Sequence, residues 1–192
     1  PRMTQPPRAP RSAPNVVLGM WRIARGRKDG LLQFGNTPQA FLASLAPLVA
    51  FPLVGVVVML LRGAGLSALT YFALTLCILL APAAISFELA RLWHREALWP
   101  RFAAAFNWGQ WVVAIVLILV LTVLSIAVGA GLDQHAAVAT LMLGLGCYAL
   151  WLHWFLARNA LQLSPLRAAL VVLLVNAATV LLGIGPRLLS VG

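Results

Sequence analysis

Five long apolar runs dominate this chain, and each is long enough to cross a lipid bilayer. They cover about residues 41–61, 66–87, 108–128, 137–161 and 165–189. Thr37 is the expected cap of the first helix, with Pro38 at its first position. The hydrocarbon of a bilayer is about 30 Å thick and a helix rises about 1.5 Å per residue, so roughly 20 apolar residues span it. In hydrocarbon a helix satisfies its backbone amides within one segment. The sequence therefore predicts an all-α polytopic membrane bundle of five transmembrane helices.

Composition excludes a soluble globular protein, because 62% of the 192 residues are hydrophobic and only 9% are charged. Such a chain has too few polar side chains to cover a water-exposed surface. The net charge of +10 comes from 14 Lys and Arg residues against 4 Asp and Glu residues. In a soluble domain this excess would suggest a nucleic-acid partner. Beside apolar spans, basic residues instead set orientation, and we expect no nucleic acid to bind.

The distribution of basic residues predicts which side of the membrane each end occupies. Twelve of the 14 Lys and Arg residues lie before the first span, between the second and third, or between the fourth and fifth. Only Arg62 and Arg187 fall to the opposite side. Since Lys and Arg concentrate in cytoplasmic connections, we expect a cytoplasmic N-terminus and, after five spans, a periplasmic C-terminus. The predicted location is a bacterial inner (plasma) membrane.

Three regions are expected along the chain. Met3 is the expected natural start, so Pro1 and Arg2 are given no meaning. Residues 1–14 combine five prolines with three arginines and no apolar cluster, which predicts a disordered basic tail. Residues 15–36 are expected to form an interfacial amphipathic segment and residues 37–192 the five-helix membrane domain. The basic start is not followed by a short apolar core and cleavage site, so no signal peptide is expected.

A short amphipathic helix is predicted over residues 16–25, with Asn15 as its N-cap. Its apolar face holds Val17, Met20, Trp21 and Ala24, and its basic side holds Arg22 and Arg25. One interpretation places this helix in the membrane interface, with its cations near anionic lipid head groups. The other interpretation packs it against the underside of the protein itself, and the pattern fits both.

A second amphipathic segment is expected over residues 88–107, with a break at Pro100. Arg91 and Arg95 in this segment lie on the same predicted side of the membrane as the first amphipathic helix. The two segments together supply the candidate contacts to partners or lipid head groups, which are Trp21, Arg22, Arg25, Arg91 and Arg95. Five of the seven tryptophans also lie near this boundary, which suggests extra structure there.

A candidate polar cluster is predicted where the third and fourth spans begin and end on the basic side. Its members are Asn107, Gln110, His153 and Asn159. Amides and imidazoles at membrane depth are costly unless they bond to one another, to water or to a ligand. One interpretation makes Asn107 and Asn159 interhelical anchors, with the Asn107 amide bonded at the inner end of the second or fourth span, beside Asn159. The other makes the cluster a small polar pocket. Asn176, near the middle of the fifth span, fits either.

The spans lack the residues that catalysis or ion transport normally needs. All four carboxylates lie outside the spans or at their ends, which argues against an acidic translocation path. The sequence has no Gly-Lys phosphate loop, no Gly-x-Ser-x-Gly elbow and no His-Glu-x-x-His pair. Bis-histidine haem ligation would need His94 beside His153, so we expect neither this nor another cofactor. The two cysteines lie in apolar runs, where we expect them to pack as small residues. The chain is expected not to be an enzyme.

Short motifs give the chain a family resemblance. They are "FGNTPQAFLASL" (34–45), "FNWGQW" (106–111) and "WFLARNALQLSP" (154–165), which follow a basic N-terminus. With five spans, the chain resembles the bacterial members of the Yip1-like group of membrane proteins. This resemblance implies a five-helix bundle and a non-enzymatic part in membrane organisation or trafficking, with protein partners. It implies no catalytic residues.

These observations predict an accessory or scaffold subunit that organises or docks a membrane protein complex. The expected partners are the lipid bilayer, other membrane protein subunits and anionic head groups at the cytoplasmic face. Two small-xxx-small pairs, Thr140 with Gly144 and Thr179 with Gly183, allow close helix contacts within the chain or with such a partner. The alternative is a small-molecule or lipid carrier that uses the polar cluster as a pocket.

Overall fold

The computed structural model describes residues 15–189, and this part consists of helices joined by short turns. In chain order the elements are α1 (Val16–Ala24), η1 (Lys28–Gln33), α2 (Pro38–Leu61), α3 (Gly65–Leu92), η2 (Glu96–Leu98), α4 (Trp99–Gly129), α5 (Gln134–Ala160) and α6 (Pro165–Leu189). The helices α2 to α6 are long and apolar enough to cross a membrane. The predicted all-α fold with five spans is confirmed, and the predicted tail over residues 1–14 lies outside the described residues.

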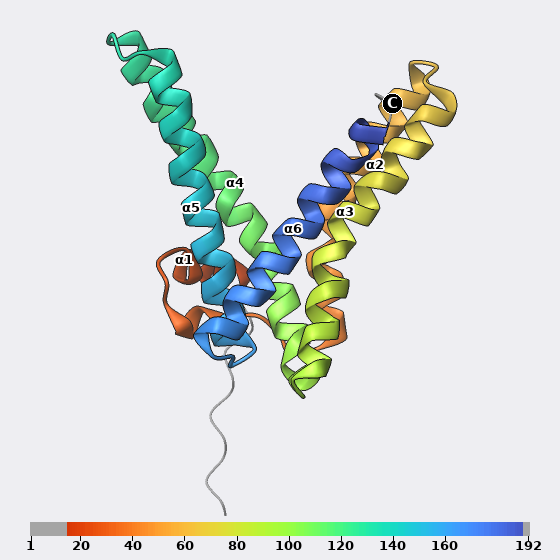
Figure 1. Ribbon diagram of the computed structural model, residues 1–192, viewed down its shortest axis with the longest axis vertical. Coiled ribbons are helices and arrows are strands. Elements are labelled where there is room, and N and C mark those ends of the chain that lie inside the picture. The colour runs from red at the N-terminus through yellow and green to blue at the C-terminus, as the bar shows by residue number, and fades with distance from the viewer. Residues whose placement is uncertain (1–14, 190–192) are drawn as a thin grey trace, which may run out of the picture.

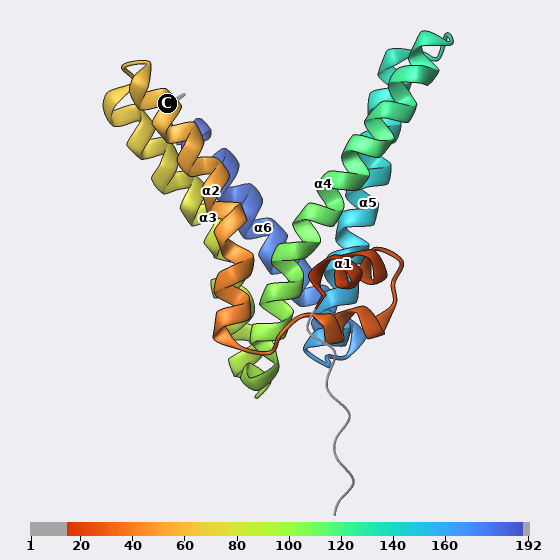
Figure 2. The same cartoon turned by 180° about the vertical axis from the view of Figure 1, so that it is seen from behind.

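The five long helices form a V (Figure 1). One arm is the pair α4 and α5, and the other arm contains α2 and α3. Helix α6 starts beneath α5 and crosses to pack along α3, so it belongs to the second arm over most of its length. The lower part of α4 packs on α2 and joins the two arms at the vertex (Figure 2). The V opens away from the end that carries α1.

The two ends of the bundle differ in how much structure they carry. The end that holds α1, η1, η2 and the turn between α5 and α6 is called the basic end here, and the other is called the far end. Among the described residues, the far end has two tight turns, which join α2 to α3 and α4 to α5, and the end of α6. The structure shows how the spans are arranged, and which end faces the cytoplasm remains a prediction.

The buried core lies at the basic end and the vertex. Large side chains without exposed surface there include Phe102, Leu152 and Leu156. Three successive alanines, 103–105, and Gly109 are also buried and allow α4 to lie close to its neighbours. A Cβ on Gly109 would lie 3.2 Å from Leu156 Cδ1, so a larger residue here would require the Leu156 side chain to shift. Small residues on α4 therefore allow α5 to pack closely against it within this arm.

Toward the far end the helices expose large apolar side chains. Ile118 and Leu143 on one arm, and Val57 and Leu181 on the other, are among them. Exposed apolar surface of this extent is incompatible with water and is the expected outer face of a membrane bundle. The helices therefore contact lipid over most of their length.

Helix starts follow the capping residues expected from the sequence. Asn15 Oδ1 accepts a hydrogen bond from Leu18 N at 3.0 Å, and Thr37 Oγ1 accepts one from Ala40 N at 3.2 Å. These side chains satisfy amides that have no partner inside the helix. The far-end turns place Gly63 and Gly131 at positive φ, 81° and 105°, where residues with a Cβ are strained. Single residues thus determine where these helices start and which turns join them.

The segment α1–η1 is attached to the long helices by specific contacts. Tyr148 on α5 donates its hydroxyl to Ala24 O at 3.1 Å, which ties down the end of α1. Asn36 joins two elements, because its Nδ2 donates to Ala97 O at 2.9 Å and its Oδ1 accepts from Arg101 N at 3.1 Å. Ile23 is fully buried in the core. Helix α1 therefore packs against the long helices with the side that carries Ile23.

The prediction of a separate amphipathic segment over residues 88–107 is wrong. Its first residues extend α3 to Leu92, and its last residues form the first turns of α4, which starts at Trp99 rather than Trp108. Between them, Arg95 N bonds to Ala90 O at 2.7 Å and closes the end of α3. Trp99 donates its indole N–H to Ser86 Oγ at 3.1 Å, so the reversal of the chain is packed tightly. Asn107 consequently lies well inside a helix.

Candidate functional site

A cavity of about 380 Å³ lies at the vertex, and all five long helices contribute to its wall. Its apolar lining includes Leu48 of α2, Pro82 of α3 and Val175 of α6. Its polar lining comprises Thr75, Asn107, Gln110, His153, Asn176 and Thr179. No charged residue is among the described residues that line it. The cavity is therefore a neutral hydrogen-bonding site.

The depth of the cavity follows from positions along the helices. Asn107 and Gln110 lie 8 and 11 residues after the start of α4, which places them about 12 to 17 Å along it at roughly 1.5 Å per residue. Asn176 lies 11 residues after the start of α6. Asn176 therefore lies near the middle of its 25-residue helix, where an unpaired polar group in a bilayer is costly, whereas Asn107 and Gln110 lie beside the predicted start of the third span.

Asn107 anchors α4 to α2. Its Nδ2 donates to Ser44 Oγ at 2.9 Å, and the Ser44 hydroxyl donates in turn to Phe41 O in its own helix at 2.6 Å. Both side chains are buried. The expectation that Asn107 bonds at the inner end of the second or fourth span, beside Asn159, is wrong. The partner is a serine on the first span, because the lower part of α4 packs on α2.

His153 is the centre of a second polar group. Its Nε2 lies 3.3 Å from Gln110 Nε2, and its Nδ1 lies 3.5 Å from Asn176 Nδ2. Its ring packs on Phe106, with 4.6 Å between ring centroids. The imidazole is buried, so helices α4, α5 and α6 meet through this one side chain. Removing it would take away contacts to two helices at once.

The hydrogen-bond roles around His153 follow from what each partner can donate. A neutral imidazole has one N–H donor and one acceptor nitrogen. Asn176 Nδ2 already donates to Val172 O at 2.8 Å, which holds this amide with its remaining hydrogen toward Nδ1. When His153 Nε2 is unprotonated, it accepts a hydrogen bond from Gln110 Nε2, which lies beside it. When Nε2 carries the proton, Gln110 accepts it through its carboxamide oxygen after a half-turn of the amide. In either arrangement at least one Gln110 amide hydrogen remains to serve the cavity.

The structure brings three of the four predicted cluster residues together and leaves the fourth apart. Asn107, Gln110 and His153 line the same cavity. Asn159 donates its Nδ2 to Phe155 O in its own helix at 2.7 Å and does not line the cavity. It lies too near the end of α5, almost two turns beyond His153, to reach the vertex. Membership of Asn159 in the cluster is therefore wrong.

Two polar groups at the vertex were missed or left open by the sequence. Ser44 was not identified, because serine inside an apolar helix usually bonds its own backbone and gives no pattern of its own. Asn176 was noted as fitting either interpretation, and the structure places it against His153. An unpaired amide in the middle of a membrane helix is energetically costly, so a lone asparagine there indicates a partner on another helix.

The candidate contacts for head groups lie at the basic end but not on one surface. Arg22 forms an ion pair with Asp29 at 3.2 Å, and Arg91 pairs with Glu88 at 2.7 Å. Arg25 stacks over the ring of Trp21, with its Cζ 3.8 Å from the ring centroid. Arg95 is exposed in the turn between α3 and η2. The arginines of α1 and of the α3–α4 turn thus have separate surroundings.

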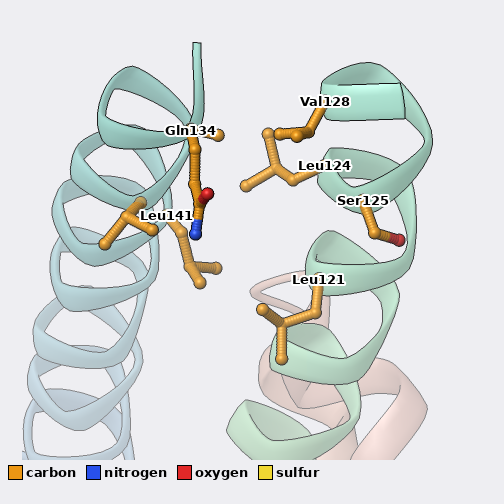
Figure 3. A pocket seen from close by; sticks show the side chains of 8 residues that line it. Leu121, Leu124, Ser125, Val128, Gln134 and Leu141 are labelled. Carbon is orange, nitrogen blue, oxygen red and sulfur yellow. The ribbon is translucent and has the colours of Figure 1, made fainter. Parts of the chain in front are cut away.

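A further cavity of about 330 Å³ lies between the tips of α4 and α5 (Figure 3). Leu121, Leu124 and Val128 face it from α4, and Leu141 faces it from α5. Gln134 directs its amide into the gap, whereas the Ser125 hydroxyl points away from α5. This crevice offers one amide among the polar side chains that face it, whereas the vertex cavity combines several polar groups from four helices.

Five apolar helices of membrane length define a multi-pass membrane protein in contact with the lipid bilayer. Comparisons of the chain with protein-family models, with curated proteins and with solved structures found no match.

Proposed function

We propose that the protein is a non-catalytic binding protein that holds the uncharged polar group of a membrane-soluble molecule in the vertex cavity. The observation that carries this proposal is the neutral set of hydrogen-bonding side chains enclosed by the membrane helices, contributed by α3, α4, α5 and α6. Ligand pockets of about 300 to 1,000 Å³ typically combine an apolar wall with a few polar groups, and this cavity has both features.

The chemistry of the ligand follows from the lining. A charged head group would have no counter-ion among the described residues of the wall, so its desolvation would not be compensated. The amide hydrogens of Gln110 and the hydroxyls of Thr75 and Thr179 instead suit carbonyl or hydroxyl oxygens. An amphiphile with such a head and an apolar tail reaches the site through the membrane. This role corresponds to a lipid or small-molecule carrier.

The test is the identity of molecules that remain bound to the purified protein. Organic extracts of wild-type protein are compared by mass spectrometry with extracts of a Gln110→Leu, His153→Phe double variant. The matched control is Thr122→Val, because the Thr122 hydroxyl donates to Ile118 O of its own helix, at 2.8 Å, and Thr122 does not line the cavity. An uncharged amphiphile is expected in the wild type and control and absent from the double variant. Identical extracts from all three proteins would refute the proposal.

A second function, an accessory or scaffold subunit, is favoured by two open glycines. Among the described residues, no atom lies within 4 Å of a Cβ built on Gly144 or Gly183, apart from their own helices and neighbours. Their small-xxx-small pairs are therefore available to a helix of a partner. This role agrees with the membrane organisation implied by the Yip1-like resemblance. Gentle-detergent isolation should yield a stoichiometric partner that Gly144→Leu removes and Gly55→Leu retains, and a lone protein would refute this role.

The proposed setting is a bacterial inner membrane with the basic end in the cytoplasm, which is supported by the concentration of Lys and Arg at that end. Single cysteines at positions 95 and 133 provide the test. A membrane-impermeant reagent should label position 133 in intact cells and position 95 only after permeabilisation. The reverse pattern would invert the orientation and leave the binding proposal intact.

A further inference from the structure

An apolar groove, distinct from the two cavities described above, lies between α1 and α4. Its volume is about 340 Å³. Its wall is formed by Val17, Met20 and Trp21 of α1 together with Ile115, Val116 and Leu119 of α4. Val17 is 76% exposed and Trp21 is 57% exposed, although both belong to the apolar face of α1. This face therefore remains largely uncovered even though Ile23, on another side of the helix, is buried.

The groove is separate from the vertex cavity. At about 3.6 residues per turn, Val116 and Leu119 project from the side of α4 roughly opposite to Asn107 and Gln110, and Ile115 projects from the flank between them. Figure 2 shows α1 beside the lower part of the arm formed by α4 and α5, outside the V. Occupancy of one site therefore does not require occupancy of the other.

Positive charge borders the groove at α1. The Arg25 guanidinium lies over Trp21, which is itself part of the wall. Asp29 neutralises its neighbours, because it pairs with Arg22 at 3.2 Å and with Arg27 at 2.9 Å. Among the described residues Arg25 forms no ion pair with a carboxylate. The apolar groove is thus bordered by Arg25, a cation without a counter-ion among the described residues.

We propose that this groove holds one acyl chain of an anionic phospholipid, with the phosphate at Arg25. The apolar wall along α4 runs from the level of α1 into the hydrocarbon, which is the path an acyl chain follows from its head group. Arg25 supplies the opposite charge that a lipid phosphate needs near the interface. The N-terminal residues 1–14 do not complement the site, since they contain three arginines and no acidic residue.

The proposal explains why α1 exposes an apolar face while its other side is docked. Gly19 and Ile23 are buried, and Tyr148 fixes the end of the helix, so α1 cannot turn its exposed side toward the core. Exposed valine and tryptophan next to arginine are the composition of helices that lie in the membrane interface. The lipid is then a structural part of the basic end rather than the ligand of the vertex cavity.

The experiment measures lipid retention by the full-length protein. Protein is reconstituted in liposomes of equal parts phosphatidylglycerol and phosphatidylcholine, extracted in gentle detergent, and the retained lipids are quantified by native mass spectrometry. Wild-type protein is expected to retain phosphatidylglycerol in preference. Arg25→Gln should reduce this preference about fivefold, the effect of roughly one basic side chain at a membrane surface. Arg158→Gln, which removes the same charge at the same end, should leave it unchanged, because the Arg158 guanidinium lies over Trp154 and not beside the groove.

A second variant tests the apolar half of the site. Val116→Phe fills the groove without changing charge and should lower the retention of phosphatidylglycerol, while Thr122→Val should not. Equal retention of both lipids by the wild type would overturn the proposal, as would equal losses in Arg25→Gln and Arg158→Gln. A co-purifying polypeptide on this face in place of lipid would also overturn it. Because the probe is anionic, none of these outcomes depends on whether the vertex cavity binds an uncharged molecule.

Discussion

The hydrogen bond between Asn107 and Ser44 leads to an unequal pair of mutational effects. Both groups are buried, and Asn107 Nδ2 donates to Ser44 Oγ at 2.9 Å. The serine hydroxyl also donates to Phe41 O at 2.6 Å. Replacing Asn107 leaves the serine hydrogen satisfied, whereas replacing Ser44 removes the only hydrogen-bond partner of the asparagine side chain among the described residues.

The expected magnitudes follow from this asymmetry. Asn107→Leu removes one interhelical hydrogen bond at membrane depth, which is worth about 0.6 kcal/mol of the free energy of unfolding. Ser44→Ala leaves a buried amide hydrogen without a partner and should cost about 1 to 3 kcal/mol. The smaller change in side-chain size should therefore be the more destabilising one. The double variant should be more stable than Ser44→Ala alone, because the unsatisfied amide is gone.

The assay is reversible unfolding in mixed micelles of increasing denaturing detergent, followed by circular dichroism. Thr122→Val is the control, since its hydroxyl bonds only to its own helix and its loss should change the free energy by about 0.5 kcal/mol or less. Additive effects in the double variant, or an Asn107→Leu cost above that of Ser44→Ala, would refute this account of the anchor. All variants are expected to insert into the membrane.

Two further predictions concern the segment α1–η1. Gly30→Ala should destabilise it by about 1 to 3 kcal/mol, because the new Cβ would lie 2.7 Å from Arg22 Cβ, and thermal unfolding should show no such loss for Gly55→Ala, where the space is open. The hydrogen bonds from Arg27 hold the pKa of Asp29 below the ordinary value of 3.8. A depressed pKa means that this ion pair stabilises the segment above the unfolded pKa and is lost as pH falls through the folded value. A chemical-shift titration of the carboxyl should thus have a midpoint below 3.8, and Arg27→Gln should raise it; an unchanged midpoint would refute the assignment.

The spans could be predicted from the sequence because their signal is local. Membrane depth requires a long apolar run, and any chain with five such runs must form five satisfied helices. The caps at Asn15 and Thr37 were predictable for the same reason, since a short polar side chain next to a helix start needs only its neighbours. The predicted end of the second span and the predicted start of the third, on either side of residues 93–98, were less accurate. Charged and aromatic residues there continue the helices beyond the hydrocarbon, which hydrophobicity alone cannot indicate.

The candidate site could be predicted only in part. Asn107, Gln110 and His153 are unusual at membrane depth, and the cost of leaving them unpaired indicated that they would find partners. Which partners they find depends on how the spans are arranged. Asn159 is chemically as suitable as Asn176, yet it lies near the end of α5 and bonds its own helix. Ser44 has no distinguishing pattern in the sequence and becomes a partner only because α2 packs on α4.

The sequence by itself determined that the chain crosses a membrane in five helices, since the length and polarity of each run decide this one segment at a time. The tertiary structure decided the V, the cavity at its vertex and the groove between α1 and α4. These features depend on which helix faces pack together, and lipid-facing apolar surfaces are chemically alike, so hydrophobicity cannot choose among them. Close packing at Gly109, the bond from Asn107 to Ser44 and the contacts of His153 make that choice. Each of them joins residues on different helices, and the sequence does not show which helices are neighbours.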